Sequence, residues 1–314
     1  MSSLVSKANE FPDRGHLTTE KRLDASRELD TLSTADMLRV MNGQDALIAG
    51  VLGEAVPKIA GLVDDVVVGM KHEGRLIYVG AGTSGRLGVL DASEIPPTFQ
   101  ADPGMVIGII AGGDGALRKS SEGKEDFYDG SHDELERLGV DEHDVLVGIA
   151  AGGTTPYVWG ALDYAKRQGG KTGFVGCVPL GPIQEKFGVE VDHLIELIVG
   201  PEVVTGSTRM KAGTATKLAL NMISTITMVK LGKVWGNLMV DVKASNVKLV
   251  DRAVRMLMGQ TELDRSAATK LLEESGGHVK LALVMHHQGV NTDEAKRLLD
   301  EAEGMLGRVA GRPK

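Results

Sequence analysis

The chain has 314 residues, a formal net charge of -8 and an isoelectric point near 5.6. This acidic balance argues against a nucleic-acid partner, which requires a dense basic face, and the length allows one large or two modest domains with a substantial core. The single cysteine, Cys177, excludes an internal disulfide. We find no apolar leader and no long apolar span, and therefore expect a cytoplasmic protein without a membrane partner.

The first part of the chain, residues 1–45, has the pattern of a polar arm followed by a helix. Ser33 or Thr34 can cap a segment in which Met37, Leu38 and Met41 recur at helical spacing. A second helix is predicted from about Gln44 to Met70.

Residues 46–250 alternate between apolar runs and helix-compatible stretches, which is typical of a parallel sheet wrapped by helices. A long helix rich in small residues is predicted from about Arg209 to Leu231. Residues 251–314 lack strand-like runs and predict a small helical subdomain. The predicted strands are Leu76 to Val79, Val106 to Ile110, Val145 to Ile149, Thr172 to Val175 and His193 to Ile195, and the predicted C-terminal helices are Glu262 to Glu274, His278 to His286 and Thr292 to Leu306.

The segment that follows the first predicted strand carries the clearest functional signal. Its glycines allow positive φ angles and close backbone approach, and its hydroxyls and N–H groups can converge on a phosphate at a helix N-terminus. A dinucleotide site is one alternative, but no acidic residue ends the second strand where a ribose would need it. A purely structural turn is the other. The candidate residues are Gly82, Thr83, Ser84, Gly85 and Arg86.

Two later segments resemble the first in kind. Gly153, Thr154 and Thr155 follow the third predicted strand, at the sheet edge where parallel α/β folds bind ligands. A third segment precedes the long helix, and its hydroxyls and basic side chains can complete an anion site, although Ser207 or Thr208 can instead simply cap that helix. Its candidate residues are Glu202, Ser207, Thr208, Arg209 and Lys211.

Two carboxylates are candidates for acid–base chemistry. Glu94 lies where Pro96 and Pro97 are expected to break the helix, beside the predicted phosphate site. Glu125 is expected on a helix after the second strand, but it belongs to an acidic cluster that also fits a solvated helix face, so the residues alone do not single it out. Histidine and cysteine lack metal-ligand spacing, and we expect no metal and no cofactor.

Three long motifs, GAGTSGRLGVLDASEIPPTF, GPEVVTGSTRMKAGTATKLALNM and GKVWGNLMVDVKASNVKL, closely resemble the N-acetylmuramic acid 6-phosphate etherases. The core of that family is a sugar isomerase (SIS) domain, so the resemblance implies a SIS-type parallel sheet sandwiched by helices, with 46–250 as the sugar-phosphate-binding domain. It also implies conversion of N-acetylmuramate 6-phosphate and water to N-acetylglucosamine 6-phosphate and D-lactate, in peptidoglycan recycling.

The resemblance assigns roles to individual residues. Glu125 would remove the proton on C2, and Glu94 would protonate the departing ether oxygen and later activate water. The second loop departs from the pattern, because Ala150, Ala151 and Gly152 stand where SIS domains carry hydroxyls. A set of residues that contacts the sugar phosphate in the related glucokinase regulatory proteins is similar to Asn246, Lys248 and Arg252. These residues can contact the site of their own chain or that of a neighbouring subunit.

The expected partner is a small amino-sugar phosphate, and SIS enzymes are commonly dimers, so a homodimer is expected. Two other functions remain open: a non-catalytic sugar-phosphate sensor similar to the glucokinase regulatory protein, and an aldose–ketose isomerase. The presence of both Glu94 and Glu125 argues against the sensor. The isomerase would share the C2 deprotonation but not the ether cleavage.

Overall fold

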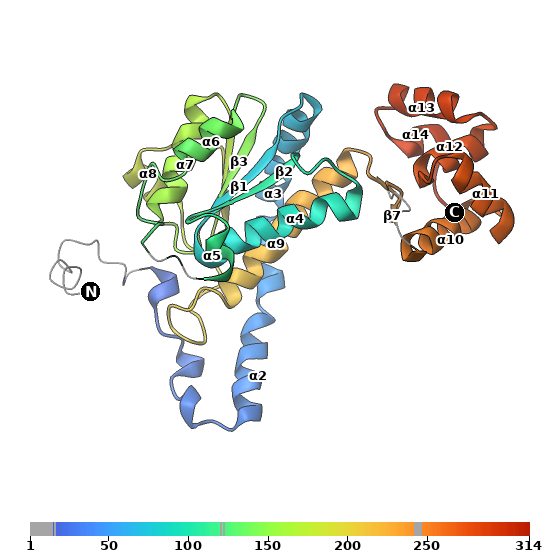
Figure 1. Ribbon diagram of the computed structural model, residues 1–314. Helices are drawn as coiled ribbons and strands as arrows, with labels where there is room; N and C mark the ends of the chain where they lie inside the picture. The colour runs from blue at the N-terminus through green and yellow to red at the C-terminus, as the bar shows by residue number, and fades with distance from the viewer. Residues whose placement is uncertain (1–14, 16, 120, 122, 242–246) are drawn as a thin grey trace.

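The computed structural model describes residues 15, 17–119, 121, 123–241 and 247–314, and its centre is a five-stranded parallel sheet (Figure 1). The strand order is β2-β1-β3-β4-β5. Leu76 pairs with Val106 on one side and with Val145 on the other, so β1 lies between the strands that follow it in the chain. All five predicted strands are confirmed: β1 Leu76–Gly80, β2 Val106–Ile110, β3 Val145–Ile149, β4 Lys171–Gly176 and β5 His193–Glu196.

Helices cover both faces of the sheet, as α/β proteins with parallel strands require. One apolar core lies between the sheet and the helices α3 (Ile48–Lys71), α4 (Gly82–Phe99) and α9 (Lys211–Lys230). A second core lies under α6 (His132–Leu138), α7 (Pro156–Arg167) and α8 (Gly181–Phe187). The expected α/β class with a helix-sandwiched parallel sheet is therefore confirmed.

Helix α4 packs close to the sheet because two of its three glycines, Gly85 and Gly88, face the strands. A Cβ on Gly85 would stand 2.7 Å from the carbonyl oxygen of Gly80, and one on Gly88 would stand 2.9 Å from Cβ of Tyr78. Pro96 and Pro97 were expected to break this helix, but it continues to Phe99. Both prolines stand in its last turn, so the two N–H groups that they lack weaken only the end of the helix.

From Thr18 on, the N-terminal region forms short 3₁₀ helices and a helix, α2, that projects from the sheet domain (Figure 1). Ser33 caps α2 as predicted, because its side chain accepts a hydrogen bond from the backbone N–H of Asp36. These elements are η2 Thr18–Glu20, η3 Asp24–Ser26, η4 Leu29–Thr31 and α2 Thr34–Asp45.

The segment Thr34–Lys71 contains an 18-residue window with a mean hydropathy of 1.7, so it is long and apolar enough to cross a membrane by length and composition alone. The expectation that the chain has no long apolar span is therefore wrong. The same segment contains α3, whose residues Leu62 and Val66 are completely buried in the core against the sheet. A helix that is buried in the core of a protein meets the same criteria of length and hydropathy.

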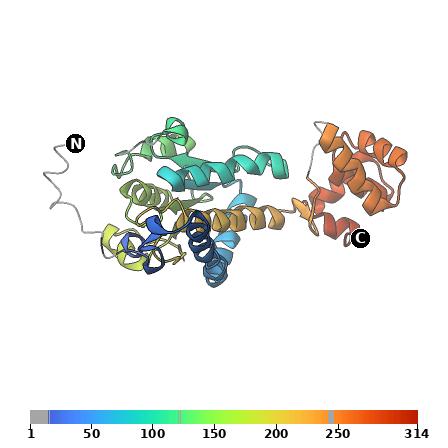
Figure 2. The ribbon, with the colours of Figure 1, turned by 90° about the horizontal axis from the view of Figure 1, so that it is seen from below.

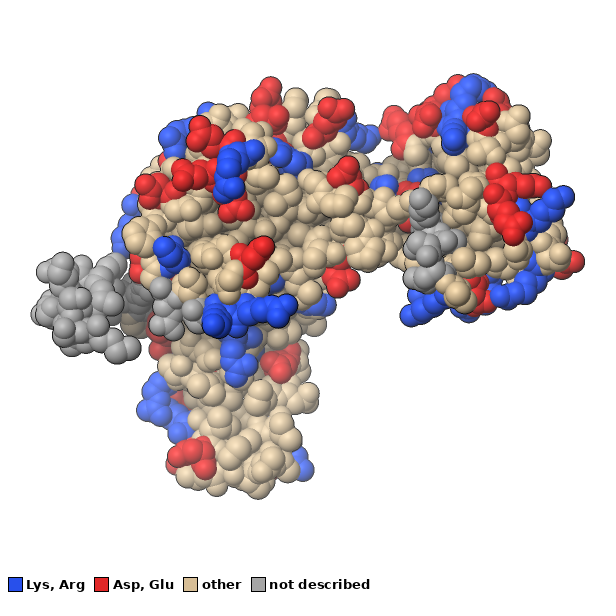
Figure 3. Space-filling model, in the orientation of Figure 1, with Lys and Arg blue, Asp and Glu red and all other residues tan. Residues whose placement is uncertain are grey.

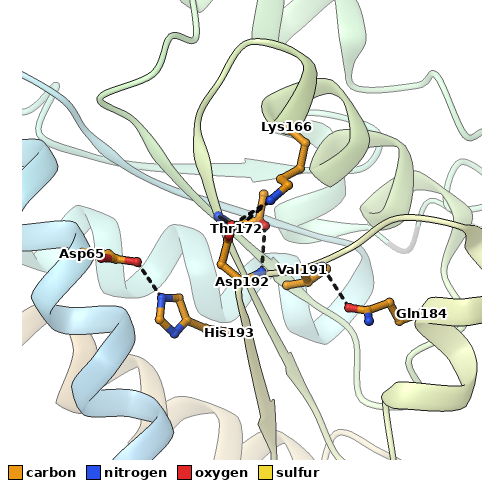
Figure 4. A network of polar contacts seen from close by, with 7 residues as sticks. All are labelled: Asp65, Lys166, Thr172, Gln184, Val191, Asp192 and His193. Carbon is orange, nitrogen blue, oxygen red and sulfur yellow. Dashed lines mark hydrogen bonds and ion pairs between the residues drawn. The ribbon is translucent and has the colours of Figure 1, made fainter.

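A polar network holds the amino-terminal end of β5 in place (Figure 4). The Asp192 carboxylate accepts hydrogen bonds from the backbone N–H and hydroxyl of Thr172, both at 2.8 Å, and forms an ion pair with Lys166. His193 Nε2 lies 2.7 Å from Asp65 Oδ2 on α3. The network therefore fixes the edge strand to α3, β4 and α7 at the end of the sheet opposite the carboxyl ends.

A helical subdomain with its own apolar core follows the end of α9 (Figures 1 and 2). It includes a helix from Val247 to Thr261 that was not predicted, although Val250, Val254 and Leu257 recur there at helical spacing. The last predicted helix is divided in two at Gly304, where φ is 74°. Its elements are the antiparallel pair β6 Val234–Trp235 and β7 Leu238–Met239, followed by α10 Val247–Thr261, α11 Arg265–Glu274, α12 Val279–Gln288, α13 Thr292–Glu301 and α14 Leu306–Ala310.

Candidate functional site

A polar cavity of about 220 Å³ opens at the carboxyl ends of β1 and β3. It is bounded by the segments after these two strands, by the start of α9 and by Glu125. This is the sheet edge at which parallel α/β proteins bind ligands. The residues that line it are Ala81, Gly82, Thr83, Ser84, Glu125, Ile149, Ala150, Ala151, Gly152, Thr155, Thr208, Gly213 and Thr216.

The N-terminus of α4 forms one wall of the cavity. Gly82 has a φ of 52°, which turns the chain from β1 directly into the helix. The first N–H groups of a helix lack intrahelical acceptors, and here they lie beside the hydroxyls of Thr83 and Ser84. Converging N–H groups, hydroxyls and the positive end of the helix dipole favour an anion.

Gly85 and Arg86 support this wall without lining the cavity. Gly85 is buried, and a Cβ there would overlap Ile110 and the backbone of Gly80. Arg86 donates hydrogen bonds to the carbonyl oxygens of Ala116, at 2.7 Å, and Leu117, at 3.2 Å, so it holds the short helix α5 (Gly115–Arg118). We predicted both as ligand contacts, but the structure gives them supporting positions.

The second loop lines the cavity mainly with backbone and methyl groups. Ala150, Ala151 and Gly152 present no hydroxyl, and Thr155 is the first polar side chain to reach the cavity. Gly153 is turned into the core at a φ of 69°, and its carbonyl accepts a hydrogen bond from Trp159 Nε1 at 2.7 Å. Of the three residues predicted in this loop, Thr155 lines the cavity, and Gly153 and Thr154 do not.

The third loop contributes Thr208, and α9 contributes Gly213 and Thr216. Glu202 does not face the cavity: it is completely buried, and its carboxylate accepts hydrogen bonds from the N–H groups of Lys211 and Ala212, at 3.0 and 2.8 Å. This carboxylate, rather than Ser207 or Thr208, caps α9 and occupies the positive end of that helix.

The basic residues of the third loop also lie away from the cavity. Lys211 is 1% exposed, and its ammonium donates a hydrogen bond to Gln44 Oε1 at 2.8 Å. Burial lowers the pKa of Lys211, although the charges of Glu202 and Asp45 oppose this shift. Arg209 is exposed, and neither it nor Ser207 is among the lining residues. Among the described residues, therefore, the lining of this cavity does not include Glu202, Ser207, Arg209 or Lys211.

Glu125 is the one ionisable residue among the described residues that line the cavity. It lies in a turn between α5 and α6, not on the predicted helix. Its backbone carbonyl accepts a hydrogen bond from the N–H of Tyr157, at 3.0 Å, which attaches the turn to the N-terminal end of α7. The exposed side chain of Glu125 thus lines the same cavity as the N-terminus of α4.

Glu94 lies in a different place from Glu125. It is exposed on α4 and lines a separate hollow of about 260 Å³ with Leu90, Lys217 and Asn221, among others. Ten residues of helix separate it from Ser84, which corresponds to about 15 Å along the axis. One chain by itself therefore does not bring the two acids to one cavity.

The hollow beside Glu94 contains a second, buried carboxylate. Burial raises the pKa of Asp91, while hydrogen bonds from Ser224 and Tyr78, both at 3.1 Å, act in the opposite direction. These bonds join α4 to β1 and α9. They fix the part of α4 that carries Glu94.

Lys248 and Arg252 lie on α10, in the helical subdomain beyond the far end of α9 (Figure 1). Helix α9 has 20 residues and is about 30 Å long, so these two residues are distant from the cavity at its start. Asn246 lies outside the described residues. Within one chain, Lys248 and Arg252 are not brought to the cavity.

Sequence analysis missed Ala81, Ile149, Gly213 and Thr216 as lining residues. Gly213 and Thr216 are three residues apart on α9 and therefore share a face, which is the one signal that could have found them. Among the residues that the structure describes, no group of three His, Cys, Asp or Glu side chains is arranged to hold a metal ion.

Comparisons with known proteins agree with this architecture. The family described as the glucokinase regulatory protein N-terminal SIS domain matches residues 58–166. The chain is 50% identical over 294 residues to a protein of Nostoc punctiforme named N-acetylmuramic acid 6-phosphate etherase, and the match covers 94% of both chains. It is 51% identical over 296 residues to a Gloeobacter violaceus protein of the same name, covering 94% of this chain and 95% of the relative.

Among solved structures, a phosphoheptose isomerase from Francisella tularensis is similar to this chain with a TM-score of 0.49 and 17% sequence identity. The similarity covers 63% of this chain and all of the isomerase.

Proposed function

The chain belongs to the N-acetylmuramic acid 6-phosphate etherase family, and we propose from this premise that it cleaves the D-lactyl ether of N-acetylmuramic acid 6-phosphate. The products are N-acetylglucosamine 6-phosphate and D-lactate. The observation that carries the proposal is that Glu125, the one carboxylate among the described lining residues, shares a cavity with the N-terminus of α4.

The phosphate of the substrate binds at the start of α4. Free N–H groups of the first turn and the hydroxyls of Thr83, Ser84 and Thr208 line that part of the cavity, and no Lys or Arg is among its described lining residues. The start of α9 is unsuitable, because Glu202 already occupies it with a negative charge. We expect the reaction in the cytoplasm, because the charge of sugar phosphates retains them there.

Glu125 acts as the base. In the open-chain sugar the aldehyde acidifies the hydrogen on C2, so a carboxylate can take this proton while the bond between C3 and the ether oxygen breaks. The departing oxygen receives a proton and leaves as D-lactate. Water then adds across the C2–C3 double bond, with its hydroxyl at C3 and a proton returned to C2.

Glu94 is the proposed acid that protonates the ether oxygen and later activates water. A sugar phosphate held at the start of α4 is shorter than the distance to Glu94 of the same chain, so the acid that completes the site comes from a second copy. We therefore propose a homodimer in which each cavity combines Glu125 of one chain with Glu94 of the other.

The outer surface of α3, α4 and α9 supports this homodimer. These helices pack side by side and expose apolar side chains, including Val56 at 48%, Leu90 at 48% and Ile226 at 46%. An apolar hollow of about 290 Å³ lies between α3 and α9. In Figure 3 the surface over α4 is mostly uncharged, and Glu94 lies on the same helix, so a copy docked here covers apolar surface next to the acid.

The activity is tested by incubating the purified chain with N-acetylmuramic acid 6-phosphate and measuring D-lactate with a coupled dehydrogenase. We expect lactate and N-acetylglucosamine 6-phosphate in equal amounts. Binding of the substrate without lactate release would instead indicate a sugar-phosphate sensor, the alternative that the match to the glucokinase regulatory protein domain favours. Formation of a hexulose phosphate would indicate an isomerase.

Sharing of the site between chains is tested with two inactive variants, Glu94→Gln and Glu125→Gln. If each site uses one acid from each chain, half of the randomly mixed dimers are heterodimers that contain one intact site. The mixture should therefore recover about a quarter of the wild-type activity. A mixture as inactive as its components would contradict the shared site.

A further inference from the structure

Thr19 lies in an N-terminal segment that packs against the sheet domain. It belongs to the short helix η2, and Leu17, the residue before that helix, is part of the apolar core under α7 and α8. Thr19 is 1% exposed. The segment also approaches the third loop, because Glu20 Oε2 lies 3.5 Å from the position that a Cβ on Gly206 would occupy.

The hydroxyl of Thr19 has no hydrogen-bond partner in the structure, although it is closed off from solvent. Buried hydroxyl groups in native proteins almost always have a partner, because burial without one loses their hydrogen bonds to water. Among the described residues, three side chains carry such a hydroxyl, those of Thr19, Ser131 and Thr227, and a bound group that reaches one of them can complete its hydrogen bonding.

The position of the Thr19 hydroxyl beside the polar cavity indicates which kind of group can bind to it. Thr19 Oγ1 lies 3.9 Å from the position that a Cβ on Gly152 would occupy, and among the described residues, apart from Gly152 and its two chain neighbours, it is the one atom within 4 Å of that position. Gly152 lines the polar cavity. Because Gly152 has no side chain, a ligand oxygen that enters the space beside it comes within reach of the Thr19 hydroxyl.

The second loop lacks side-chain hydrogen-bond donors at the cavity, and Thr19 can supply one. Ile149, Ala150, Ala151 and Gly152 line the cavity without any side-chain donor. A hydroxyl that reaches the loop from the N-terminal segment supplies the missing donor from outside the sheet domain. Since water is excluded there, its hydrogen bond to an anion is strong.

We propose that Thr19 is a ligand-binding residue whose hydroxyl donates a hydrogen bond to a phosphate oxygen of the sugar phosphate bound in the polar cavity. This inference rests on the proposed function for the identity of the ligand, but it requires only that the cavity bind a phosphate group. The N-terminal segment is then part of the binding site and not only a covering of the sheet domain.

The test compares three variants: Thr19→Val, which keeps the shape and removes the hydroxyl, Thr19→Ser, which keeps the hydroxyl, and Thr18→Val, a matched control in the same short helix. The melting temperature is measured without ligand, and the dissociation constant is measured with inorganic phosphate as the probe. Inorganic phosphate keeps this test independent of etherase activity.

For Thr19→Val we expect two effects of opposite sign. The melting temperature of the free protein is unchanged or higher, since an unsatisfied buried hydroxyl is removed, while the dissociation constant for phosphate rises about tenfold. For Thr19→Ser and Thr18→Val we expect dissociation constants for phosphate within about twofold of the wild-type value. A twofold change corresponds to less free energy than a typical hydrogen bond contributes.

A second variant, Thr19→Val with Gly152→Ser, returns a hydroxyl from the loop itself. Gly152 has an ordinary φ and ordinary contacts, so serine fits there, and we expect it to restore most of the phosphate affinity. The proposal is overturned if Thr19→Val leaves phosphate binding unchanged, or if it lowers the melting temperature and Gly152→Ser does not restore binding. Absence of phosphate binding to the wild type overturns it as well.

Discussion

Replacing Glu202 with alanine should destabilise the sheet domain strongly, because this side chain caps α9 from a completely buried position. Its two carboxylate oxygens accept hydrogen bonds from the N–H groups of Lys211 and Ala212, at 3.0 and 2.8 Å. Each hydrogen bond to a charged group contributes about 1.5–3 kcal/mol, so losing both costs about 3–6 kcal/mol. The buried ammonium of Lys211 also loses the attraction of this carboxylate.

Urea unfolding followed by tryptophan fluorescence measures this loss. Of the chain's two tryptophans, Trp159 is buried under the sheet and Trp235 lies in the core of the helical subdomain. In a Trp235→Phe background the signal reports the sheet domain alone. The control is Glu136→Ala on α6, an exposed position where we expect a change within about 0.5 kcal/mol. A loss below about 1 kcal/mol for Glu202→Ala would refute the assigned cap.

Gly85→Ala should lower the free energy of unfolding by about 3 kcal/mol, because the added Cβ would lie 2.6 Å from Ile110 Cγ1. Gly43→Ala, with open space around it, should raise the free energy of unfolding by about 0.5–1 kcal/mol. Equal effects of the two variants in urea unfolding would contradict the close packing of α4. Burial raises the pKa of Asp192, but hydrogen bonds to Thr172 and the Lys166 ammonium outweigh it and lower the pKa from its ordinary value of 3.8. Wild type should therefore be more stable than Asp192→Asn above pH 3.8, and the difference should disappear as the pH falls through the lower, folded-state pKa. Burial raises the pKa of Cys177 to about 12, so a thiol reagent at pH 8 should modify it only after unfolding; rapid modification of the native protein would contradict its burial.

The strands were predictable because each is a short apolar run that ends in glycine or polar residues. Val145 to Ile149, for example, is buried at every position, as a central parallel strand must be. The order of the strands was not predictable from these runs, since every strand carries similar apolar residues. Helix α10 was not predicted, although the signal was present: Val250, Val254 and Leu257 recur at helical spacing.

The location of the cavity could be predicted, because glycine and hydroxyl residues follow β1 and β3 at the same edge of the sheet. The direction of individual side chains could not. Arg86, Glu202 and Lys211 have the chemistry of ligand contacts, but each is used inside the protein, on α5, α9 and Gln44 respectively. A local pattern identifies the loop, whereas the choice of partner depends on elements distant in sequence.

Thr19 illustrates the same limit. Its position beside Gly152 joins residues that are more than one hundred positions apart, and no local spacing connects them. The separation of Glu94 from Glu125 also follows from the third dimension, since the continuous helix α4 carries Glu94 away from the cavity.

The most direct test of the account is the exchange of the C2 hydrogen of the sugar phosphate with solvent deuterium, measured by nuclear magnetic resonance. We predict that wild type and Asp126→Asn, a matched control at the neighbouring exposed carboxylate, both incorporate deuterium at C2. Glu125→Gln should bind the substrate but incorporate none, because its side chain is the base that removes this hydrogen. Deuterium incorporation by Glu125→Gln at the wild-type rate would contradict the account.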